Sequence, residues 1–159
     1  LALTFFFFNF IKKELIAPED RGAFFVIIKA PQGSGFNFTK DRAEDIEKLL
    51  LEKGVKNYQN LAGKTTIPEL INRISELDLL ITGDSGPMHV AAVFKVPTVA
   101  IFGPTKDDET SQWMNEKSII VKKNLDCQPC MKRTCPLQHH NCMNLIKAVD
   151  VLSAVKTFN

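Results

Sequence analysis

Two short apolar runs, each followed by a glycine-containing turn, constrain the fold of this chain most. The runs are LLIT at 79–82 and TVAIF at 98–102, and the segment between them begins with Gly-Asp-Ser-Gly-Pro. Strands that are buried on both faces of a parallel sheet have this kind of continuous apolar sequence. The turns that follow parallel strands lie at one edge of the sheet, where α/β folds bind their ligands. The segment therefore predicts two parallel strands joined by a helix, with a binding site at their carboxyl ends.

The first of these turns carries the start signals of a helix and the features of an anion site. Ser85 or Gly86 is placed to cap the helix, and Pro87 suits a first turn, where a missing N–H costs nothing. The unpaired N–H groups and the positive dipole end of a helix start favour a phosphate. His89 would add a further donor to that anion. The alternative is that Asp84 and Ser85 only cap the helix and that His89 packs under a loop.

The rest of the chain alternates between predicted strands and helices, without an internal repeat. Strands are expected at 24–29, near 58–61 and at 118–121, and helices at 41–53, from 67 onward and at roughly 145–157. Thr66 and Glu69 form a capping box for the second helix. The expected core faces of the first two helices consist of Ile46, Leu49 and Leu50, and of Leu70, Ile71, Ile74 and Leu77. The pattern predicts an α/β fold with a parallel sheet and helices on both faces.

Residues 1–23 form an atypical apolar segment, and 24–159 are expected to form one domain. The opening run LALTFFFFNFI is shorter than the roughly 20 apolar residues that span a bilayer. It also lacks a basic leader and a small-residue cleavage site, so it is a poor secretory signal. The formal net charge of +2 gives no argument for nucleic acid, and no nucleic-acid partner is expected.

Two glycine-containing motifs imitate nucleotide-binding loops but lack residues that those loops need. The GKT sequence at 63–65 matches the end of a P-loop, yet Tyr58 occupies the place of the first glycine. The QGSG sequence at 32–35 follows a predicted strand, yet Phe38 stands where a dinucleotide fingerprint has its third glycine. The sequence therefore predicts neither a P-loop NTPase nor this dinucleotide fingerprint.

A segment near the end of the chain contains all four cysteines in the spacing C-x2-C-x4-C-x6-C, namely Cys127, Cys130, Cys135 and Cys142. With His139 and His140 it offers enough ligands for tetrahedral zinc. The intervals match no common zinc ribbon or finger, so reduced thiols are the favoured interpretation and no metal is expected. Lys132 and Arg133 in the same segment either face phosphate groups or form a solvated basic loop.

In their order along the chain, these motifs resemble glycosyltransferase family nine. DSGPMH at 84–89 is followed by two alanines, by VPTVAIFGPT at 96–105 and by the cysteine segment at 127–142. More narrowly, the chain is similar to the ADP-heptose:lipopolysaccharide heptosyltransferase II group over about 60–155. That resemblance implies a Rossmann-like fold, corresponding to the C-terminal half of a two-domain GT-B glycosyltransferase. This half binds the nucleotide-sugar donor.

The resemblance also implies a reaction and its partners. ADP-heptose would be the donor and the lipopolysaccharide inner core the acceptor, with no cofactor required. The general base is expected in an N-terminal acceptor domain, so no catalytic residue is assigned in this chain. A cytoplasmic location follows, with peripheral contact at the inner membrane as an option. A stand-alone nucleotide-binding module and a metal-stabilised structural domain that uses 127–142 are the alternatives.

The expected donor site combines the residues of the first turn with three threonines. Backbone N–H groups at the helix start would bind the diphosphate, and Asp84 would orient the turn or a sugar hydroxyl. By position, Thr65 or Thr66 borders the adenine pocket, and Thr105 lines the same cleft. The donor-binding set is Asp84, Ser85, Gly86, Pro87, Met88, His89, Thr65, Thr66 and Thr105.

Overall fold

The computed structural model describes residues 24–26, 36–55 and 57–158. The expected 1–23 segment, the loop at 32–35 and the end of the first predicted strand lie outside the described residues. In chain order the elements are β1 (Phe24–Val26), α2 (Phe36–Glu52), α3 (Ile67–Ser75), β2 (Leu79–Gly83), α4 (Gly86–Val93), β3 (Thr98–Ile101), α5 (Asp107–Thr110), β4 (Ser118–Val121), α6 (Asn141–Asn144), α7 (Ala148–Val155) and the 3-10 helix η1 (Lys156–Phe158).

The strands form one parallel sheet in the order β1-β2-β3-β4. Leu80 of β2 pairs with Thr98 of β3, and Thr98 pairs with Ser118 of β4. The apolar runs at 79–82 and 98–102 thus form the two central strands, as predicted. Helix α4 connects them, so this crossover is the βαβ unit that parallel strands require.

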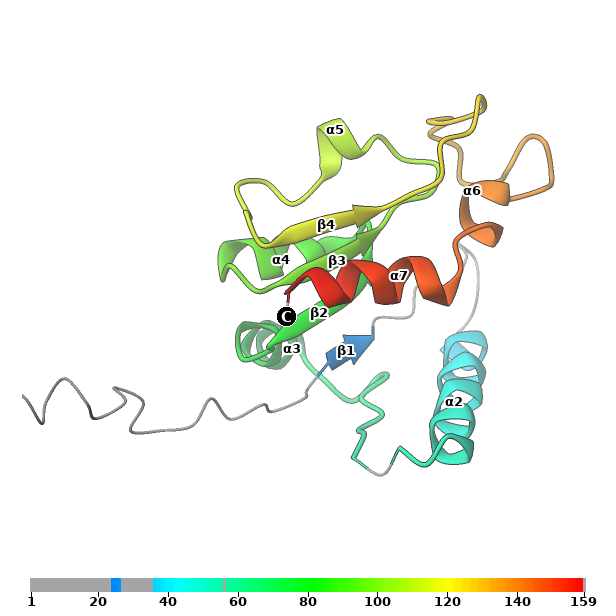
Figure 1. Ribbon diagram of the computed structural model, residues 1–159. Coiled ribbons are helices and arrows are strands. Elements are labelled where there is room, and N and C mark those ends of the chain that lie inside the picture. Colours follow the sequence, from blue (N-terminus) through cyan, green and yellow to red (C-terminus); the bar gives the residue numbers. More distant parts are fainter. Residues whose placement is uncertain (1–23, 27–35, 56, 159) are drawn as a thin grey trace, which may run out of the picture.

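Helices cover both faces of the sheet, which confirms the predicted fold class. Figure 1 shows α7 in front of the sheet and α3 and α4 behind it. On one face, Leu80 packs with Ile74 of α3 and Ala91 of α4, all fully buried. On the other face, Val99 of β3 packs with Ala154 of α7. Because successive strand residues point to opposite faces, both faces of the central strands must be apolar, and this explains their uninterrupted apolar sequence.

The predicted strand near 58–61 is wrong, since this stretch forms no strand pairing. Its polar side chains bind helix α2 instead. The Tyr58 hydroxyl donates to Glu47 Oε1 at 3.1 Å, and Asn60 Nδ2 donates to Glu47 Oε2 at 3.2 Å. Helix α2 (Phe36–Glu52) begins five residues before the predicted start at 41 and ends one residue before the predicted end at 53. It stands apart from the sheet (Figure 1). Side-chain bonds to α2 therefore take the place of the expected strand pairing.

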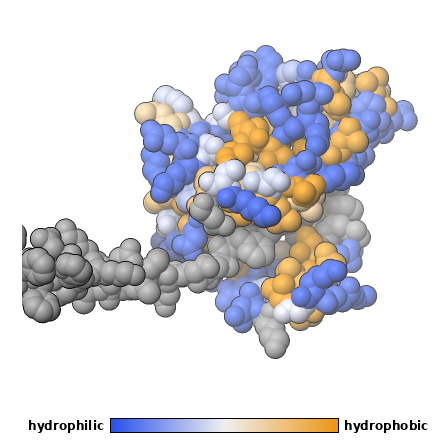
Figure 2. Space-filling model, in the orientation of Figure 1, coloured by the Kyte–Doolittle hydropathy of each residue, from blue (hydrophilic) through white to orange (hydrophobic). Residues whose placement is uncertain are grey.

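Helix α2 also leaves part of its expected core face exposed. Leu49 is 53% exposed and Leu51 is 58% exposed, and Figure 2 shows apolar residues on the visible surface of this helix. These leucines are exposed because α2 stands apart from the sheet, so that no described strand lies under its apolar face.

The capping box of α3 is confirmed. The Glu69 N–H donates to Thr66 Oγ1, and the Thr66 N–H donates to Glu69 Oε2 at 2.7 Å. Ile74 is fully buried on the expected core face, whereas Ile71 lies at its exposed margin. The last predicted helix is shorter than 145–157, since regular helix begins at Ala148 and a 3-10 turn completes the segment. Among the described helices, none is both long and apolar enough to cross a bilayer.

Candidate functional site

Three connections leave the sheet at the same level and form the candidate site. The register pairs Gly83 with Ile101 and Ile101 with Val121, so β2, β3 and β4 end side by side. The segments that follow are the turn before α4, the connection from Gly103 to α5, and the loop that follows β4. This is the carboxyl edge at which parallel α/β sheets bind ligands, as the sequence predicted.

The turn after β2 leaves the start of α4 without a side-chain cap. Ser85 occupies the N-cap position in extended conformation, but its hydroxyl makes no capping bond. It donates to the Gly83 carbonyl at 3.2 Å and lies 3.2 Å from Thr82 Oγ1. The prediction that Ser85 or Gly86 begins the helix is confirmed for Ser85 as the N-cap residue, but its hydroxyl makes no capping bond because it turns back toward the strand end. The Ser85 side chain therefore does not cap the N–H of Gly86, the first helical residue.

The remaining residues of this turn divide into buried and exposed positions. Gly86 is the first helical residue and is exposed, so its N–H has no intrahelical acceptor. Pro87 has no N–H, and the Met88 N–H bonds to the Ser85 carbonyl at 3.0 Å. The Met88 side chain is fully buried against Phe102. His89 is exposed, which contradicts the alternative that it packs under a loop.

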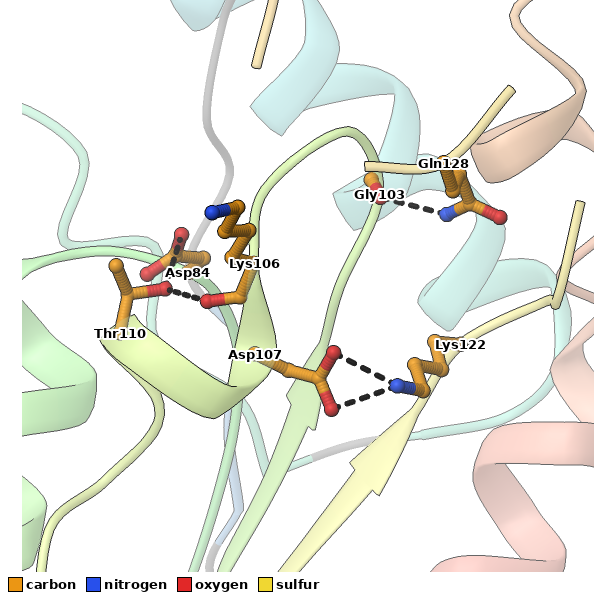
Figure 3. Close-up of polar contacts among 7 residues, drawn as sticks. All are labelled: Asp84, Gly103, Lys106, Asp107, Thr110, Lys122 and Gln128. Carbon is orange, nitrogen blue, oxygen red and sulfur yellow. Dashed lines mark hydrogen bonds and ion pairs between the residues drawn. The ribbon is translucent and has the colours of Figure 1, made fainter. Parts of the chain in front are cut away.

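Helix α5 joins this turn to the next connection. Thr110 Oγ1 lies 3.2 Å from Asp84 Oδ2 and 2.8 Å from the Lys106 carbonyl (Figure 3). Three residues earlier on the same helix, Asp107 accepts two hydrogen bonds of 2.7 Å from Lys122 Nζ. The Glu109 carboxylate raises the pKa of Lys106 by its hydrogen bond and charge. The short helix therefore fixes the Asp84 carboxylate on one side and the end of β4 on the other.

Beyond α5, a cavity of about 260 Å³ opens between the ends of β3 and β4. Thr105 and Gly103 line one side, and the loop at 122–129 lines the other. Gln128 Nε2 donates to the Gly103 carbonyl at 2.6 Å and so joins the loop after β4 to the connection after β3 (Figure 3). Of the predicted site residues, only Thr105 lines this cavity. Helix α5 contacts both regions, because Thr110 bonds to Asp84 of the turn at 83–89 and Asp107 of the lining accepts from Lys122.

Thr65 and Thr66 are not joined to this edge by any hydrogen bond that the structure gives. Thr66 bonds only within the start of α3, to Glu69 and Leu70. Its N–H and hydroxyl lower the pKa of the Glu69 carboxyl. The capping role of Thr66 is therefore established, and its expected place beside an adenine stays a prediction.

The four cysteines all carry free thiols. Burial raises the pKa of Cys142, and the other three cysteine thiols raise it further. Backbone N–H groups, that of His140 first, lower the pKa of Cys135. Within the described part of the chain, no three or more His, Cys, Asp or Glu side chains are arranged to hold a metal ion. Lys132 and Arg133 lie in an exposed loop.

Sequence reasoning missed Thr110, Asp107, Lys122 and Gln128. A helix of four residues is too short to show a periodicity, so nothing in the sequence indicated α5. Nor did the sequence contain a signal for Gln128, whose partner Gly103 lies 25 residues earlier. These residues lie at the site because the parallel pairing of β2, β3 and β4 brings their connecting segments to the same edge of the sheet.

Comparison with known proteins gives the family. The model of glycosyltransferase family 9 (heptosyltransferase) matches residues 34–141. A lipooligosaccharide heptosyltransferase 2 from Campylobacter jejuni subsp. jejuni serotype O:2 is 49% identical over 117 residues, which are 74% of this chain and 36% of that protein. Lipopolysaccharide heptosyltransferase 2 from Escherichia coli strain K12 is 37% identical over 62 residues, 39% of this chain and 18% of that protein.

A solved structure, that of the Escherichia coli ADP-heptose lps heptosyltransferase II, aligns with 71% of this chain and 33% of its own, at a TM-score of 0.48 and 24% identity. The chain thus spans about a third of the length of these first relatives. The family match covers the turn at 83–89, the connection at 103–106 and most of the cysteine segment. The chain belongs to glycosyltransferase family 9.

Proposed function

We propose that this chain is the donor-binding part of a glycosyltransferase that moves heptose from ADP-heptose to the lipopolysaccharide inner core. Membership of a heptosyltransferase family supports the reaction class. The names of the relatives, heptosyltransferases of lipooligosaccharide and lipopolysaccharide, support the acceptor. The rest of the enzyme would supply the N-terminal acceptor domain and the general base.

The observation that carries this proposal is the uncapped start of α4. The Ser85 hydroxyl bonds to the strand end, and the N–H of Gly86, the first residue of α4, has no acceptor within the helix. An N-terminus of this kind favours a diphosphate, because it combines unpaired donors with the positive end of the helix dipole. At the N-cap position itself, Ser85 makes no side-chain capping bond to this start.

The same geometry suits the chemistry of glycosyl transfer. Cleavage of the sugar–phosphate bond leaves negative charge on the departing diphosphate, and an enzyme accelerates this step by stabilising that charge most strongly in the transition state. Gly86 would donate its N–H to the diphosphate, and exposed His89 would add a side-chain donor. Asp84, held by Thr110, would fix the turn or accept a hydrogen bond from a sugar hydroxyl. In this proposal the helix start stabilises the negative charge of the diphosphate, so no metal ion or other cofactor is required.

The remaining assignments belong to the same proposal. Thr65 or Thr66 would border the adenine, and Thr105 would line the donor cleft. The enzyme would act in the cytoplasm, where its nucleotide-sugar donor is available, with its lipid-linked acceptor bringing it to the inner face of the membrane. The alternative of a stand-alone nucleotide-binding module predicts tight ADP binding without any partner domain.

A calorimetric titration of ADP into the folded chain tests the proposal, with GDP and UDP as controls. Selective ADP binding in the millimolar range supports it, since half of a two-domain cleft provides only part of the contacts. Equal binding of the three nucleotides, or none by a chain that circular dichroism shows to be folded, would contradict it.

A further inference from the structure

The hydroxyl group of Thr110, the last residue of α5, contacts the segments that follow β2 and β3 (Figure 3). Its Oγ1 atom is 3.2 Å from Asp84 Oδ2 and 2.8 Å from the carbonyl oxygen of Lys106. A threonine hydroxyl has one proton to donate, so these two acceptors compete for it. The acceptor that receives the proton decides whether α5 holds the Asp84 carboxylate.

The Lys106 carbonyl has other donors, and Asp84 is the stronger acceptor. The carbonyl accepts from the backbone N–H groups of Glu109 at 3.3 Å and of Thr110 at 3.0 Å, so it is paired without the Thr110 hydroxyl. A hydrogen bond to a carboxylate is roughly twice as strong as one between neutral groups. The hydroxyl therefore donates to Asp84, and α5 supplies a hydrogen bond to the turn after β2.

Helix α5 is itself bound to the next strand of the sheet, so it can hold Asp84 in place. Asp107, three residues before Thr110, accepts two hydrogen bonds of 2.7 Å from Lys122 Nζ. Lys122 directly follows β4. The turn after β2 is thus connected, through Thr110 and α5, to the end of β4.

The turn that contains Asp84 depends on side-chain bonds to keep one conformation. Gly83 precedes Asp84 and Gly86 follows Ser85, and glycine restricts the backbone less than any other residue. On the strand side, the Ser85 hydroxyl donates to the Gly83 carbonyl at 3.2 Å. On the side of α5, Thr110 binds Asp84. These bonds hold the two residues that lead into the first residue of α4.

We propose that Thr110 is a positioning residue of the donor site, which acts through the Asp84 carboxylate on the turn before α4. This inference rests on the proposed function, because that function assigns the diphosphate to the start of α4. Thr110 does not contact the donor in this assignment. Its hydroxyl fixes the turn that leads to the Gly86 N–H, so its loss weakens donor binding without removing a contact to the donor.

The first arm of the test measures ADP binding by calorimetry on Thr110→Val and Thr110→Ser. Thr110→Val removes the hydroxyl and should weaken ADP about fivefold, the effect of one net hydrogen bond. Thr110→Ser keeps the hydroxyl and should bind ADP as the unmodified chain does. Thr157→Val is the matched control, because the Thr157 hydroxyl donates to the Ala154 carbonyl at 2.8 Å, in the last helical segment of the chain. It should leave ADP binding unchanged.

A double-mutant cycle shows whether Thr110 acts through Asp84. In an Asp84→Ala background, Thr110→Val should cause no further loss of ADP affinity, because its partner is already absent. A general effect on the fold would instead persist in that background and would lower the melting temperature of both chains. An equal loss of affinity in the two backgrounds overturns the inference.

The second arm measures the turn without any nucleotide. Backbone order parameters from 15N relaxation should fall at Asp84 and Ser85 in Thr110→Val and return to their original values in Thr110→Ser. If Thr110→Val does not fold, Thr110→Ala takes its place with the same expectations, since it adds no methyl group at the position of the hydroxyl.

The inference is overturned if the chain without the Thr110 hydroxyl binds ADP as tightly as the unmodified chain, or if the order parameters of the turn do not change. Failure of the proposed function has a different signature, namely an unmodified chain with no preference for ADP over GDP and UDP. In that case the order parameters still decide whether Thr110 holds the turn.

Discussion

Replacing Ser85 by Asp should stabilise the chain and abolish ADP binding at the same time. In the structure the Ser85 hydroxyl bonds to the Gly83 carbonyl and leaves the start of α4 uncapped. A carboxylate cannot donate to that carbonyl, so the new side chain should turn toward the helix start and share the Met88 N–H, which bonds to the Ser85 carbonyl at 3.0 Å. The gain is about 0.5–2 kcal/mol for the cap and about 0.3–1 kcal/mol for the interaction with the dipole. Loss of the bonds to Gly83 and Thr82 offsets part of it, so we expect a net gain of about 1 kcal/mol.

The same carboxylate should repel a diphosphate. Two unit charges 4 Å apart interact by about 4 kcal/mol at an effective dielectric constant of 20, which corresponds to a loss of affinity of more than a hundredfold. The added carboxylate would also occupy the positive end of the helix dipole, which the diphosphate would otherwise use. ADP binding in the millimolar range should therefore become undetectable by calorimetry.

Urea unfolding and ADP titration of one preparation measure both effects. Ser153→Asp places the same charge at an exposed position of α7 and should change neither property. Ser85→Ala removes the hydroxyl without adding charge and should keep ADP binding. A Ser85→Asp chain that is folded and binds ADP as well as the unmodified chain would refute the assignment of the diphosphate to α4.

Three further substitutions test other parts of the structure. His89→Ala should weaken ADP binding with little change in melting temperature, because the side chain is exposed; a large drop in melting temperature would show that it supports the fold. Gln112→Met should raise the free energy of unfolding by about 1 kcal/mol, since Gln112 is 5% exposed and neither amide atom has a partner in the described part of the chain; a lower urea midpoint would contradict this. Lys123 and the Lys147 N–H lower the pKa of Asp150, so its contribution to stability is complete above the unfolded carboxyl pKa of about 3.9 and is lost as the pH falls through the lower folded value. Asp150→Asn should therefore lower the melting temperature at pH 7 but not at about pH 2, and an equal loss at both would count against the ion pair.

The sequence predicted the central part of the fold because short apolar runs bounded by glycine and proline have few alternatives. Strands β2, β3 and β4 formed close to the expected residues. The start of α3 was predicted by a local signal, the pair Thr66 and Glu69, whose bonds span three residues. Predictions of this kind succeed when the interactions that determine the structure are local or come from burial on both faces.

Predictions failed where contacts between distant segments decide the structure. The stretch at 58–61 has a suitable composition for a strand, but its polar side chains bind Glu47, 11 and 13 residues earlier. The Ser85 hydroxyl has two acceptable partners, the helix start and the strand end, and the sequence does not say which one it takes. Thr110 reaches Asp84 across 26 residues, and nothing in either residue's neighbourhood indicates the contact.

The charges along the carboxyl edge of the sheet suggest where the two parts of the proposed donor, the diphosphate and the sugar, would lie. The start of α4 offers the positive end of a helix dipole and a Gly86 N–H that Ser85 does not cap with its side chain. One strand further along, the acidic residues of α5 meet lysines, so that Asp107 pairs with Lys122 and Glu109 with Lys106. A nucleotide sugar has a charged diphosphate and a neutral sugar, and these need different surroundings. On the proposed function, the diphosphate would therefore lie at the end of β2, and the surface beside it, where the charges of α5 are already paired, would suit the neutral sugar.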